Sequence, residues 1–398
     1  MERRDVIIVG SGPAGAATAL ALATRDPARA ARTVLLEKAR HPRDKTCAGG
    51  VIPKATALLD ALGVRLAVPE ARVDAAAVAV PGATVRIAGA NLCRVVRRRD
   101  LDAALAWAAR DRGVELREEE RVVHVAREGR GVRVETARRT YWAPVVVGAD
   151  GSGSVVRRAL VGAPRGAVAR AVMADVPIAA TRWDGHAARR YDFDFTSCPG
   201  GLRGYRWTFP CLVGGTPHAN VGVYALPPVA GARLQAELAR ELERIGACAA
   251  GWKAFPIQTF GARTRVAAPH VLLAGDAAGV DPLMGEGISF AIEYGLCAAD
   301  AVVDAFARDA WDFTGYVRAV HGGAIGRKLR RLGLGARLFY GRHARAWLRL
   351  AAASRRAQAI GLAWYNGVDG WDERGALGAL ASLAGIGRPL PAVRAEVA

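Results

Sequence analysis

Short apolar runs followed by glycine-rich turns and small-residue segments recur along the chain. The run Asp5–Val9 leads through several glycines into Ala16–Ala23, whose residues nearly all favour a helix. A second apolar run, Thr33–Leu36, follows, and the same order returns as Val271–Ala274, a turn and a long apolar segment. Strands that alternate with helices at this spacing predict a parallel sheet.

Between these two units the apolar positions alternate with polar ones, which predicts antiparallel strands. Val73–Cys93 has this alternation around a turn at Pro81 and Gly82, typical of a hairpin. Residues 167–225 are strand-like with Gly and Pro at intervals, and Ala232–Ile245 has the period of an amphipathic helix.

The fold class expected from these patterns is α/β. We predict a discontinuous Rossmann-like domain built from residues 1–72, 94–165 and 262–310. An antiparallel β-sheet domain, formed by residues 73–93 and 166–261, is inserted into it. Residues 311–398 are expected to form a C-terminal helical region.

The first glycine turn has the chemistry of a dinucleotide site. A strand that enters a helix through Gly10, Gly12 and Gly15 lets backbone N–H groups and the helix dipole meet a pyrophosphate. The next strand ends in Glu37, whose carboxylate can accept hydrogen bonds from both hydroxyls of an adenosine ribose.

The second glycine turn repeats this logic far along the chain. Asp276, after Gly275, can accept a hydrogen bond from a ribityl chain, and Pro282 shapes the turn that follows. Gly285 and Gly287 leave room for the next helix to point its N-terminus at an isoalloxazine ring. The two turns together predict one FAD molecule gripped at both ends.

Two further motifs resemble those of the flavoprotein hydroxylase fold. Asp150, Gly151, Ser154 and Arg157 have the spacing D-G-x-x-S-x-x-R after an apolar strand. Arg98 begins an R-x-x-L-D sequence, and a guanidinium there can bind the flavin pyrophosphate through two parallel hydrogen bonds. The resemblance implies that the Asp150 block braces the flavin domain.

Three longer signatures narrow the family. They are Lys45–Ala55 (KTCAGGVIPKA), the Y-x-W-x-F-P sequence within Pro199–Pro210, and Gly275–Gly295 (GDAAGVDPLMGEGISFAIEYG). Over residues 5–310 the chain resembles the geranylgeranyl reductase family, FAD enzymes that saturate isoprenoid double bonds in lipids, chlorophyll precursors or quinones. Ala48 stands where the family often has glycine, a departure that bears on the substrate rather than on the cofactor.

The resemblance and the two turns together define an expected cofactor site. Val122 contributes through its backbone, and Cys47 either acts in catalysis, by tuning the flavin or holding a proton, or is inert packing. The expected cofactor-binding residues are Gly10, Gly12, Ala14, Gly15, Glu37, Lys38, Cys47, Ala48, Gly50, Arg98, Val122, Asp150, Gly275, Asp276, Pro282, Gly285, Gly287 and Ile288.

The resemblance also implies a substrate tunnel. Strand alternation turns Tyr205, Trp207 and Phe209 to one face, and Pro210 completes the motif. An isoprenoid chain has no polar group that could form hydrogen bonds, so apolar contact must place its double bond against the flavin. The alternative for these aromatic residues is an ordinary stripe in the core between two sheets.

Two other functions remain open at this point. The same superfamily contains FAD-dependent monooxygenases and halogenases, and the W-x-W-x-I-P sequence of halogenases is close to Tyr205–Pro210. Such an enzyme would act on an aromatic or tailoring substrate. A non-catalytic lipid-binding protein that keeps FAD as a structural group is the other alternative. For a reductase, the expected electron source is NAD(P)H or a ferredoxin-type donor, because a second G-x-G-x-x-G turn is missing from the sequence.

Composition limits the partners. The 398 residues carry a net charge of +19, but only five of the 56 basic residues are lysine and no nucleic-acid-binding module is recognisable. We therefore expect no nucleic acid. No uncharged apolar stretch reaches the roughly 18–20 residues of a membrane span, and the cysteine and histidine spacings predict no metal site. We expect a cytoplasmic protein.

One stretch suits a membrane surface. Between Phe313 and Val368 the sequence has no acidic residue, and basic residues alternate with leucine and aromatic residues. This pattern predicts peripheral association with the inner face of a membrane, and the alternative is a solvated helix packed on the flavin domain. The basic residues are Arg318, Arg327, Lys328, Arg330, Arg331, Arg337, Arg342, Arg345, Arg349, Arg355 and Arg356.

Overall fold

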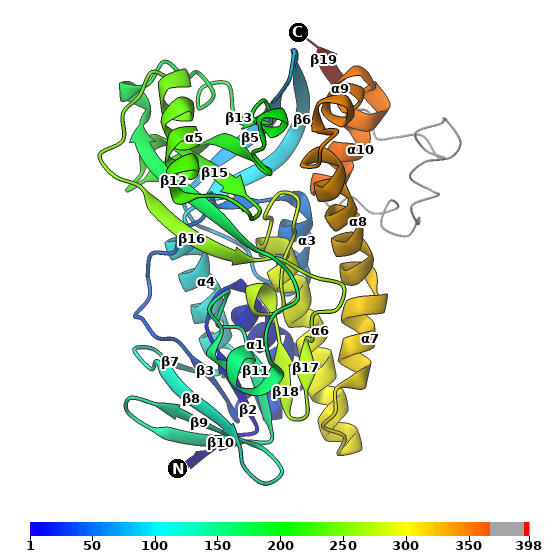
Figure 1. The fold of residues 1–398 in the computed structure, drawn as a ribbon. Helices are drawn as coiled ribbons and strands as arrows, with labels where there is room; N and C mark the ends of the chain where they lie inside the picture. The colour runs from blue at the N-terminus through cyan, green and yellow to red at the C-terminus, as the bar shows by residue number, and fades with distance from the viewer. Residues whose placement is uncertain (367–393, 398) are drawn as a thin grey trace.

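The computed structural model describes residues 1–366 and 394–397. Three sheets form its framework, with the six-stranded and four-stranded sheets in the lower half of Figure 1 and the nine-stranded sheet in the upper half. The C-terminal helices run along one side of the molecule and contact both halves (Figure 1). The predicted α/β class, with a Rossmann-like unit and a largely antiparallel sheet, is confirmed.

The six-stranded sheet is parallel except at one edge, where β17 is antiparallel. Its central strands are buried on both faces, which explains their continuous apolar sequences. In spatial order the strands are β17 (Ala267–Ala268), β18 (Val271–Leu273), β11 (Val145–Gly148), β2 (Val6–Val9), β3 (Thr33–Leu36) and β7 (Glu115–Arg117).

Helix α1 (Pro13–Arg25) packs between α6 (Ile288–Arg308) and α4 (Arg98–Asp111). Small residues permit the close approach, because a Cβ on Gly295 would lie 2.7 Å from the Ala17 Cβ. Helix α1 begins three residues earlier than the alanine-rich run predicts, since Pro13 is well suited to a first helical turn. The shorter helices of this half are α2 (Pro27–Ala30) and α3 (Pro53–Ala61).

The nine-stranded sheet contains the long hairpin β5–β6, which extends three residues beyond the predicted range at each end. Neighbouring strands are antiparallel except for the parallel pair β13–β5, and α5 (Gly231–Arg244) covers one face. The order is β16 (Lys253–Gln258), β12 (Val168–Pro177), β15 (Thr216–Ala225), β14 (Gly204–Val213), β13 (Arg190–Asp194), β5 (Glu70–Val80), β6 (Ala83–Val96) and β19 (Arg394–Val397), with β4 (Gly50–Val51) paired to β6.

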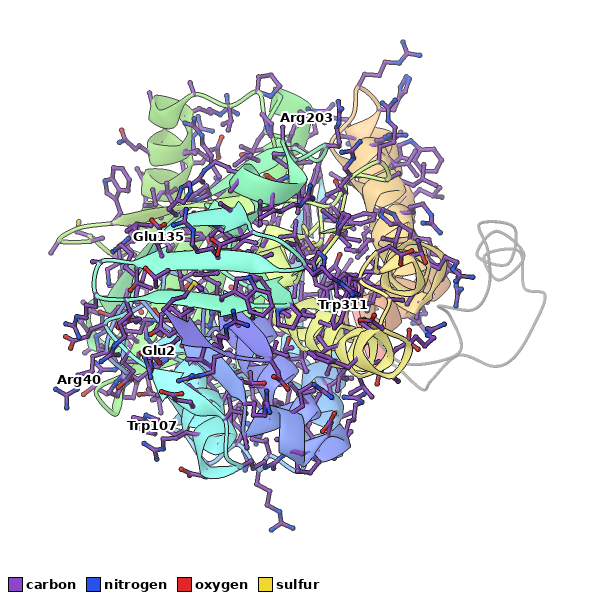
Figure 2. The ribbon with its side chains drawn as sticks, turned by 90° about the horizontal axis from the view of Figure 1, so that it is seen from below. Glu2, Arg40, Trp107, Glu135, Arg203 and Trp311 are labelled. Carbon is purple, nitrogen blue, oxygen red and sulfur yellow. The ribbon has the colours of Figure 1, made fainter. Side chains whose placement is uncertain are left out.

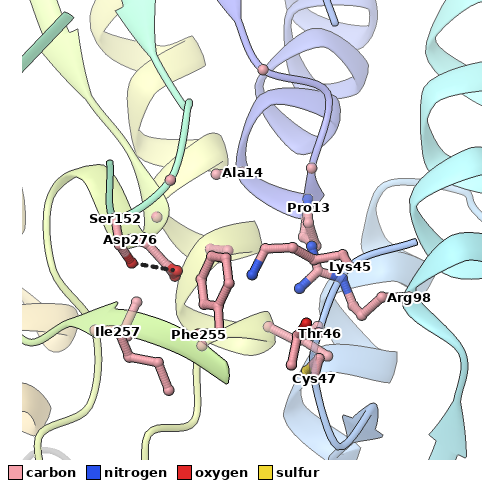
Figure 3. Close-up of a pocket in the computed structure, with 18 of the residues that line it drawn as sticks. Pro13, Ala14, Lys45, Thr46, Cys47, Arg98, Ser152, Phe255, Ile257 and Asp276 are labelled. Atoms are coloured by element: carbon pink, nitrogen blue, oxygen red, sulfur yellow. Dashed lines mark hydrogen bonds between the residues drawn. The ribbon is translucent and has the colours of Figure 1, made fainter. Parts of the chain in front are cut away.

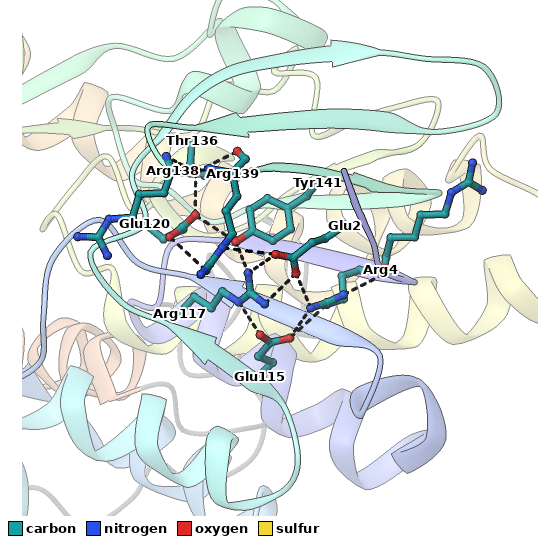
Figure 4. A network of polar contacts seen from close by, with 10 residues as sticks. Glu2, Arg4, Glu115, Arg117, Glu120, Thr136, Arg138, Arg139 and Tyr141 are labelled. Atoms are coloured by element: carbon teal, nitrogen blue, oxygen red, sulfur yellow. Dashed lines mark hydrogen bonds and ion pairs between the residues drawn. The ribbon is translucent and has the colours of Figure 1, made fainter.

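A small four-stranded sheet lies at the end of the molecule that carries the N-terminus. Its strands are β1 (Glu2–Arg3), β10 (Thr140–Ala143), β9 (Val132–Thr136) and β8 (Val122–Arg127). Figure 2 views this end, with Glu2 and Glu135 on the sheet and Trp107 projecting from α4. Arg117 on β7 binds Glu2 and Glu115 in an ion-pair network that joins this sheet to the six-stranded one (Figure 4).

Four helices follow α6 along the side of the molecule: α7 (Thr314–Gly322), α8 (Ala324–Phe339), α9 (Ala344–Ala353) and α10 (Arg355–Asn366). The structure differs from the helical prediction at residues 394–397, which pair antiparallel with β6. Residues 367–393 and 398 of the predicted region lie outside the described residues. None of the described helices combines the length and apolar character that crossing a bilayer requires.

Candidate functional site

A cavity of about 720 Å³ lies where the carboxyl ends of the parallel strands face the nine-stranded sheet. Its wall brings together segments from residue 9 to residue 365, including both glycine turns. The predicted site residues that line it are Gly10, Gly12, Ala14, Glu37, Lys38, Cys47, Ala48, Gly50, Arg98, Val122, Asp150, Tyr205, Trp207, Phe209, Gly275, Asp276, Gly285, Gly287 and Ile288.

Gly15, Pro282 and Pro210 do not line the cavity, and each has an evident structural place. A Cβ on Gly15 would lie 1.9 Å from the Gly10 carbonyl oxygen, so this glycine allows α1 to pack against the turn. The Pro282 carbonyl accepts a hydrogen bond from the Tyr224 hydroxyl at 3.0 Å. Pro210 follows Phe209 on β14 and therefore faces the opposite side of that strand.

The first glycine turn depends on a backbone conformation that favours glycine. Gly10 has a φ of +96°, and a Cβ there would lie 2.5 Å from the Ala149 carbonyl oxygen. The turn leads directly into Pro13, so the N-terminus of α1 opens onto the cavity wall beside Gly12. The unpaired N–H groups and the dipole of a helix N-terminus attract an anion such as a pyrophosphate.

Glu37 is a buried carboxylate at the end of β3. It accepts hydrogen bonds from the Ser11 hydroxyl at 2.8 Å and from the Arg43 guanidinium at 3.1 Å. Burial alone would raise the pKa of Glu37, but Arg43 and Ser11 together hold it below its ordinary value. The side chain is therefore ionised and able to accept hydrogen bonds from ribose hydroxyls.

Arg98 begins α4 and forms a paired contact with Asp102, from Nε at 2.7 Å and from Nη2 at 2.8 Å. Asp102 thus occupies one edge of the guanidinium, and Arg98 also lines the cavity. Burial lowers the pKa of Arg98, but Asp102 raises it overall, so the group keeps its charge. Arg43 also binds Asp102, at 2.9 Å, which links the Arg98 and Glu37 clusters.

The Asp150 block joins the two glycine turns. Asp150 Oδ2 accepts a hydrogen bond from the backbone N–H of Val155 at 2.7 Å, whereas its buried Oδ1 has no partner among the described residues. Arg157 donates to the carbonyl of Ala277 at 3.0 Å, and the Ser152 hydroxyl donates to Asp276 at 3.1 Å (Figure 3). Burial raises the pKa of Asp150.

The second glycine turn lies at the N-terminus of α6. Gly275 and Gly285 have φ values of +61° and +67°, and Gly287 immediately precedes the helix. Glu286 accepts hydrogen bonds from the backbone N–H and the hydroxyl of Ser289, at 2.8 and 2.6 Å. Glu286 therefore caps the N-terminus of α6.

The aromatic end of the cavity is built on β14. Tyr205 and Trp207 lie on one face with ring centroids 6.0 Å apart, and Phe209 stacks on Tyr191 at 5.1 Å. The Trp207 indole N–H donates to Asn220 at 2.8 Å, which fixes the orientation of the ring. These side chains give the cavity a rigid, apolar wall.

Cys47 lines the cavity, and its thiol accepts a hydrogen bond from the backbone N–H of Gly49 at 3.3 Å. Near it, Lys45 points at the ring of Phe255, with 3.1 Å between Nζ and the ring centroid (Figure 3). Burial and the neighbouring Arg98 lower the pKa of Lys45 to about 8. Lys45 lies in a motif that the sequence singled out, but only the fold brings Phe255 to it.

The far end of the cavity is lined by Val122 and Glu120. Glu120 Oε1 accepts hydrogen bonds from Thr136 at 2.7 Å and from Tyr141 at 3.1 Å (Figure 4). The sequence pointed to Val122 but not to Glu120 or Arg43, whose charges were visible but lay in no motif. Lys45 lay within a motif, but the motif gave it no role in the site.

The placement of the residues that line the cavity suits the successive parts of an FAD molecule. At one end are a buried ionised carboxylate and a helix N-terminus, and at the other are a second helix N-terminus and an aromatic wall. The unpaired Asp150 Oδ1 between them is a buried acceptor that a hydroxyl of a ribityl or ribose group would satisfy. The cavity thus combines polar groups suited to a nucleotide with an aromatic wall.

Comparisons with known proteins also indicate FAD binding. The family model described as FAD binding domain matches residues 3–299. The menaquinone reductase of Mycolicibacterium smegmatis is 31% identical over 364 residues, which cover 83% of this chain and 84% of that protein. The digeranylgeranylglycerophospholipid reductase 1 of Methanopyrus kandleri is 29% identical and covers 77% of this chain and 82% of its own.

Solved structures share the fold. A geranylgeranyl bacteriochlorophyll reductase-like protein from Thermoplasma acidophilum has a TM-score of 0.76 at 20% identity, covering 91% of this chain and 96% of its own. The flavin-dependent halogenase CmlS has a TM-score of 0.65, also at 20% identity, and covers 85% of this chain and 65% of its own. The chain therefore belongs to the FAD binding domain family and is an FAD-dependent oxidoreductase, similar in sequence to reductases of menaquinone and of digeranylgeranylglycerophospholipid.

Proposed function

We propose that this protein reduces C=C bonds in an isoprenoid chain, geranylgeranyl or polyprenyl, carried by a lipid or by a quinone side chain. The observation that carries the proposal is the aromatic wall of Tyr205, Trp207 and Phe209, which lines the same cavity as the glycine turn before α6. The relatives that are about 30% identical are reductases of such compounds, which supports reduction over halogenation or oxygenation.

In this proposal residues 1–72, 94–165 and 262–310 hold the cofactor, and residues 73–93 and 166–261 form the substrate side. Glu37 receives the ribose hydroxyls, Arg98 and the α1 N-terminus receive the pyrophosphate, and Asp276 receives the ribityl chain. Bound FAD in its reduced form supplies a hydride to one carbon of the double bond. The N-terminus of α6 favours negative charge beside it.

The aromatic wall orients the substrate by shape. An isoprenoid offers only apolar surface, so its position must come from contact with rings that do not move. Tyr205 donates to the Met284 carbonyl and Trp207 donates to Asn220, so their polar atoms are already satisfied. The wall therefore presents ring surface to the cavity and keeps water from the double bond.

We also propose that the protein works at the inner face of a membrane and receives electrons from NAD(P)H or a ferredoxin-type donor. Helices α8 and α9 carry three exposed apolar side chains, Leu334 (48%), Trp347 (39%) and Leu350 (59%). The same two helices and the turn between them also carry exposed arginines, namely Arg327, Arg330, Arg337, Arg342, Arg345 and Arg349. A basic surface with apolar side chains suits an anionic bilayer, where polyprenyl substrates dissolve.

The test is direct. Dithionite-reduced enzyme is incubated anaerobically with geranylgeranyl diphosphate, menaquinone or membrane lipid extract. The masses of the products are then measured by mass spectrometry. Products heavier by two hydrogens support the proposal. In a parallel incubation under air, products that gain an oxygen or a halogen atom would instead identify a monooxygenase or halogenase. Unchanged substrates in every incubation would reject isoprenoid reduction.

A further inference from the structure

Three tyrosines among the described residues line the cavity, and the hydroxyl groups of two of them already donate hydrogen bonds to backbone carbonyls. Tyr205 donates to the carbonyl of Met284, and Tyr224 donates to the carbonyl of Pro282. The third, Tyr365 on α10, donates to no residue in the described part of the chain. A hydroxyl without a partner on the wall of a buried cavity is available to whatever enters that cavity.

Tyr365 reaches the reaction end of the cavity from outside the two sheets. Its ring lies edge-on to Tyr191 and Phe193, with centroids 6.1 and 5.8 Å away. Its hydroxyl oxygen is 3.8 Å from the position that a Cβ on Gly50 would take, and Phe209 lies 3.6 Å from that same position. The hydroxyl thus lies between β4 and the aromatic wall.

Other proton-bearing groups at this end are differently placed. Both oxygens of Glu286 are occupied by Ser289, and the Cys47 thiol accepts a hydrogen bond from Gly49. Burial raises the pKa of Tyr365 well above its ordinary value, so the hydroxyl keeps its proton at any physiological pH. Among the described residues, Tyr365 therefore offers a hydroxyl proton at the point where an alkene would meet the aromatic wall, whereas the nearby Cys93 thiol donates to the Arg94 carbonyl at 3.6 Å.

We propose that Tyr365 is a catalytic residue that donates the proton which completes saturation of the double bond. This inference rests on the proposed function. The π bond of the alkene breaks as one carbon takes a hydride from the reduced cofactor, and the adjacent carbon takes the proton of the Tyr365 hydroxyl. Two C–H bonds form, the Tyr365 O–H bond breaks, and a water molecule then returns a proton to the phenolate oxygen.

The central variant is Tyr365→Phe, which removes only a hydroxyl that has no described partner and keeps the ring contacts. It should fold and bind FAD like the parent protein, as judged by thermal unfolding and by absorbance near 450 nm. Binding of a fully saturated phytanyl analogue, followed by quenching of flavin fluorescence, should also stay unchanged. A single turnover of the unsaturated substrate should slow by roughly 100-fold or more, the usual contribution of a positioned proton donor.

Solvent isotope measurements separate donation from positioning. In deuterated water the parent protein should show a solvent isotope effect on the single turnover and place one deuterium in the product. Tyr365→Phe should lose that isotope effect or change it, because water must then deliver the proton. Cys47→Ala, run beside it, tests the competing donor, and Trp107→Phe, an exposed change on α4, should keep the isotope effect of the parent protein.

The outcomes divide cleanly. If Tyr365→Phe keeps the parent rate and isotope effect, the donor role is overturned while isoprenoid reduction still stands. If Tyr365→Phe lowers the affinity for the saturated analogue by the same factor as it lowers the single-turnover rate, Tyr365 is a binding residue and the proposal is wrong. If Cys47→Ala alone removes the isotope effect, the thiol is the donor. If the parent protein reduces no isoprenoid, the proposed function fails first and this inference fails with it.

Discussion

The hydroxyl of Tyr340 donates a hydrogen bond to the carbonyl oxygen of Leu283 across 2.6 Å. Tyr340 immediately follows α8, and Leu283 belongs to the turn that leads from the second glycine segment to α6. The same turn receives hydroxyl groups from Tyr224 at Pro282 and from Tyr205 at Met284. Three tyrosines from separate parts of the chain thus hold three consecutive carbonyls, which fixes this side of the cavity and ties the C-terminal helices to it.

Tyr340→Phe tests this tie. The change leaves the buried Leu283 carbonyl without its donor, which should lower the free energy of unfolding by about 1–3 kcal/mol. FAD affinity should fall as well, because the turn borders the cavity. Urea unfolding and titration with FAD measure the two effects. Trp107→Phe, an exposed change on α4, should alter neither, and equal losses in both variants would contradict the interpretation.

Asp281 gives the same turn a pH dependence. Its carboxylate accepts hydrogen bonds from the N–H groups of Leu283 and Met284, yet burial raises its pKa to about 7, with a partial offset from Lys328. Because the pKa of Asp281 is higher in the folded state, protonation of this carboxyl group stabilises the fold. The contribution is complete below the ordinary pKa of 3.8 and is lost as the pH rises through about 7.

Asp281→Asn should therefore flatten one segment of the stability profile. The free energy of unfolding of the parent protein should fall between about pH 4 and pH 7 relative to that of the variant. A constant offset of about 1 kcal/mol accompanies the loss of one hydrogen bond, because an amide oxygen replaces only one of the two acceptors. Parallel profiles for the two proteins would show that Asp281 does not titrate in this range.

Asp276→Ala should purify largely colourless. The side chain lines the cavity and accepts from Ser152, and removal of a charged acceptor typically costs about tenfold or more in affinity. Flavin content follows from the ratio of absorbance near 450 nm to that of the protein. Asp300→Ala provides the control, since Asp300 is exposed on α6 and forms an ion pair with Arg25. A fully yellow Asp276→Ala protein would remove Asp276 from the proposed site.

The sequence predicted the parts of the fold and site that depend on local pattern. The apolar runs and glycine spacing fixed the parallel strands and both turns, because Gly10 and Gly275 occupy conformations that few other residues adopt. The alternation of Tyr205, Trp207 and Phe209 was likewise readable, since a strand turns every second side chain to one face.

What the sequence could not reveal depends on contacts between distant segments. Arg43 matters because it meets Glu37 and Asp102, and Lys45 because it meets Phe255 on β16. Tyr340 follows α8 and Tyr365 lies in α10, and the pattern of both helices predicts only amphipathic packing. Their approach to the cavity follows from how α8 and α10 pack against the two larger units, which no local spacing encodes.

Trp207 offers a test of the aromatic wall. Trp207→Ala should keep FAD but lose at least about tenfold in the rate of alkene reduction, because the wall no longer positions the substrate. Gly222→Ala is a matched change that keeps the indole ring but displaces it, since a Cβ there would lie 2.1 Å from the Trp207 indole. Both variants should fail in the same assay with normal flavin absorbance. Full turnover in either variant would show that these aromatic residues only pack in the core and do not position the substrate.

The exposed face of α8 and α9 should bind anionic membranes. Its arginines attract negative headgroups at about 1 kcal/mol each near the surface, and Trp347 and Leu350 can insert among the acyl chains. Arg345→Glu with Arg349→Glu should weaken binding to phosphatidylglycerol vesicles at least tenfold, and Trp347→Ser with Leu350→Ser should weaken it at all salt concentrations. Co-sedimentation measures both. Phosphatidylcholine vesicles are the control, and equal binding to both lipids would show that charge does not direct this face to a membrane.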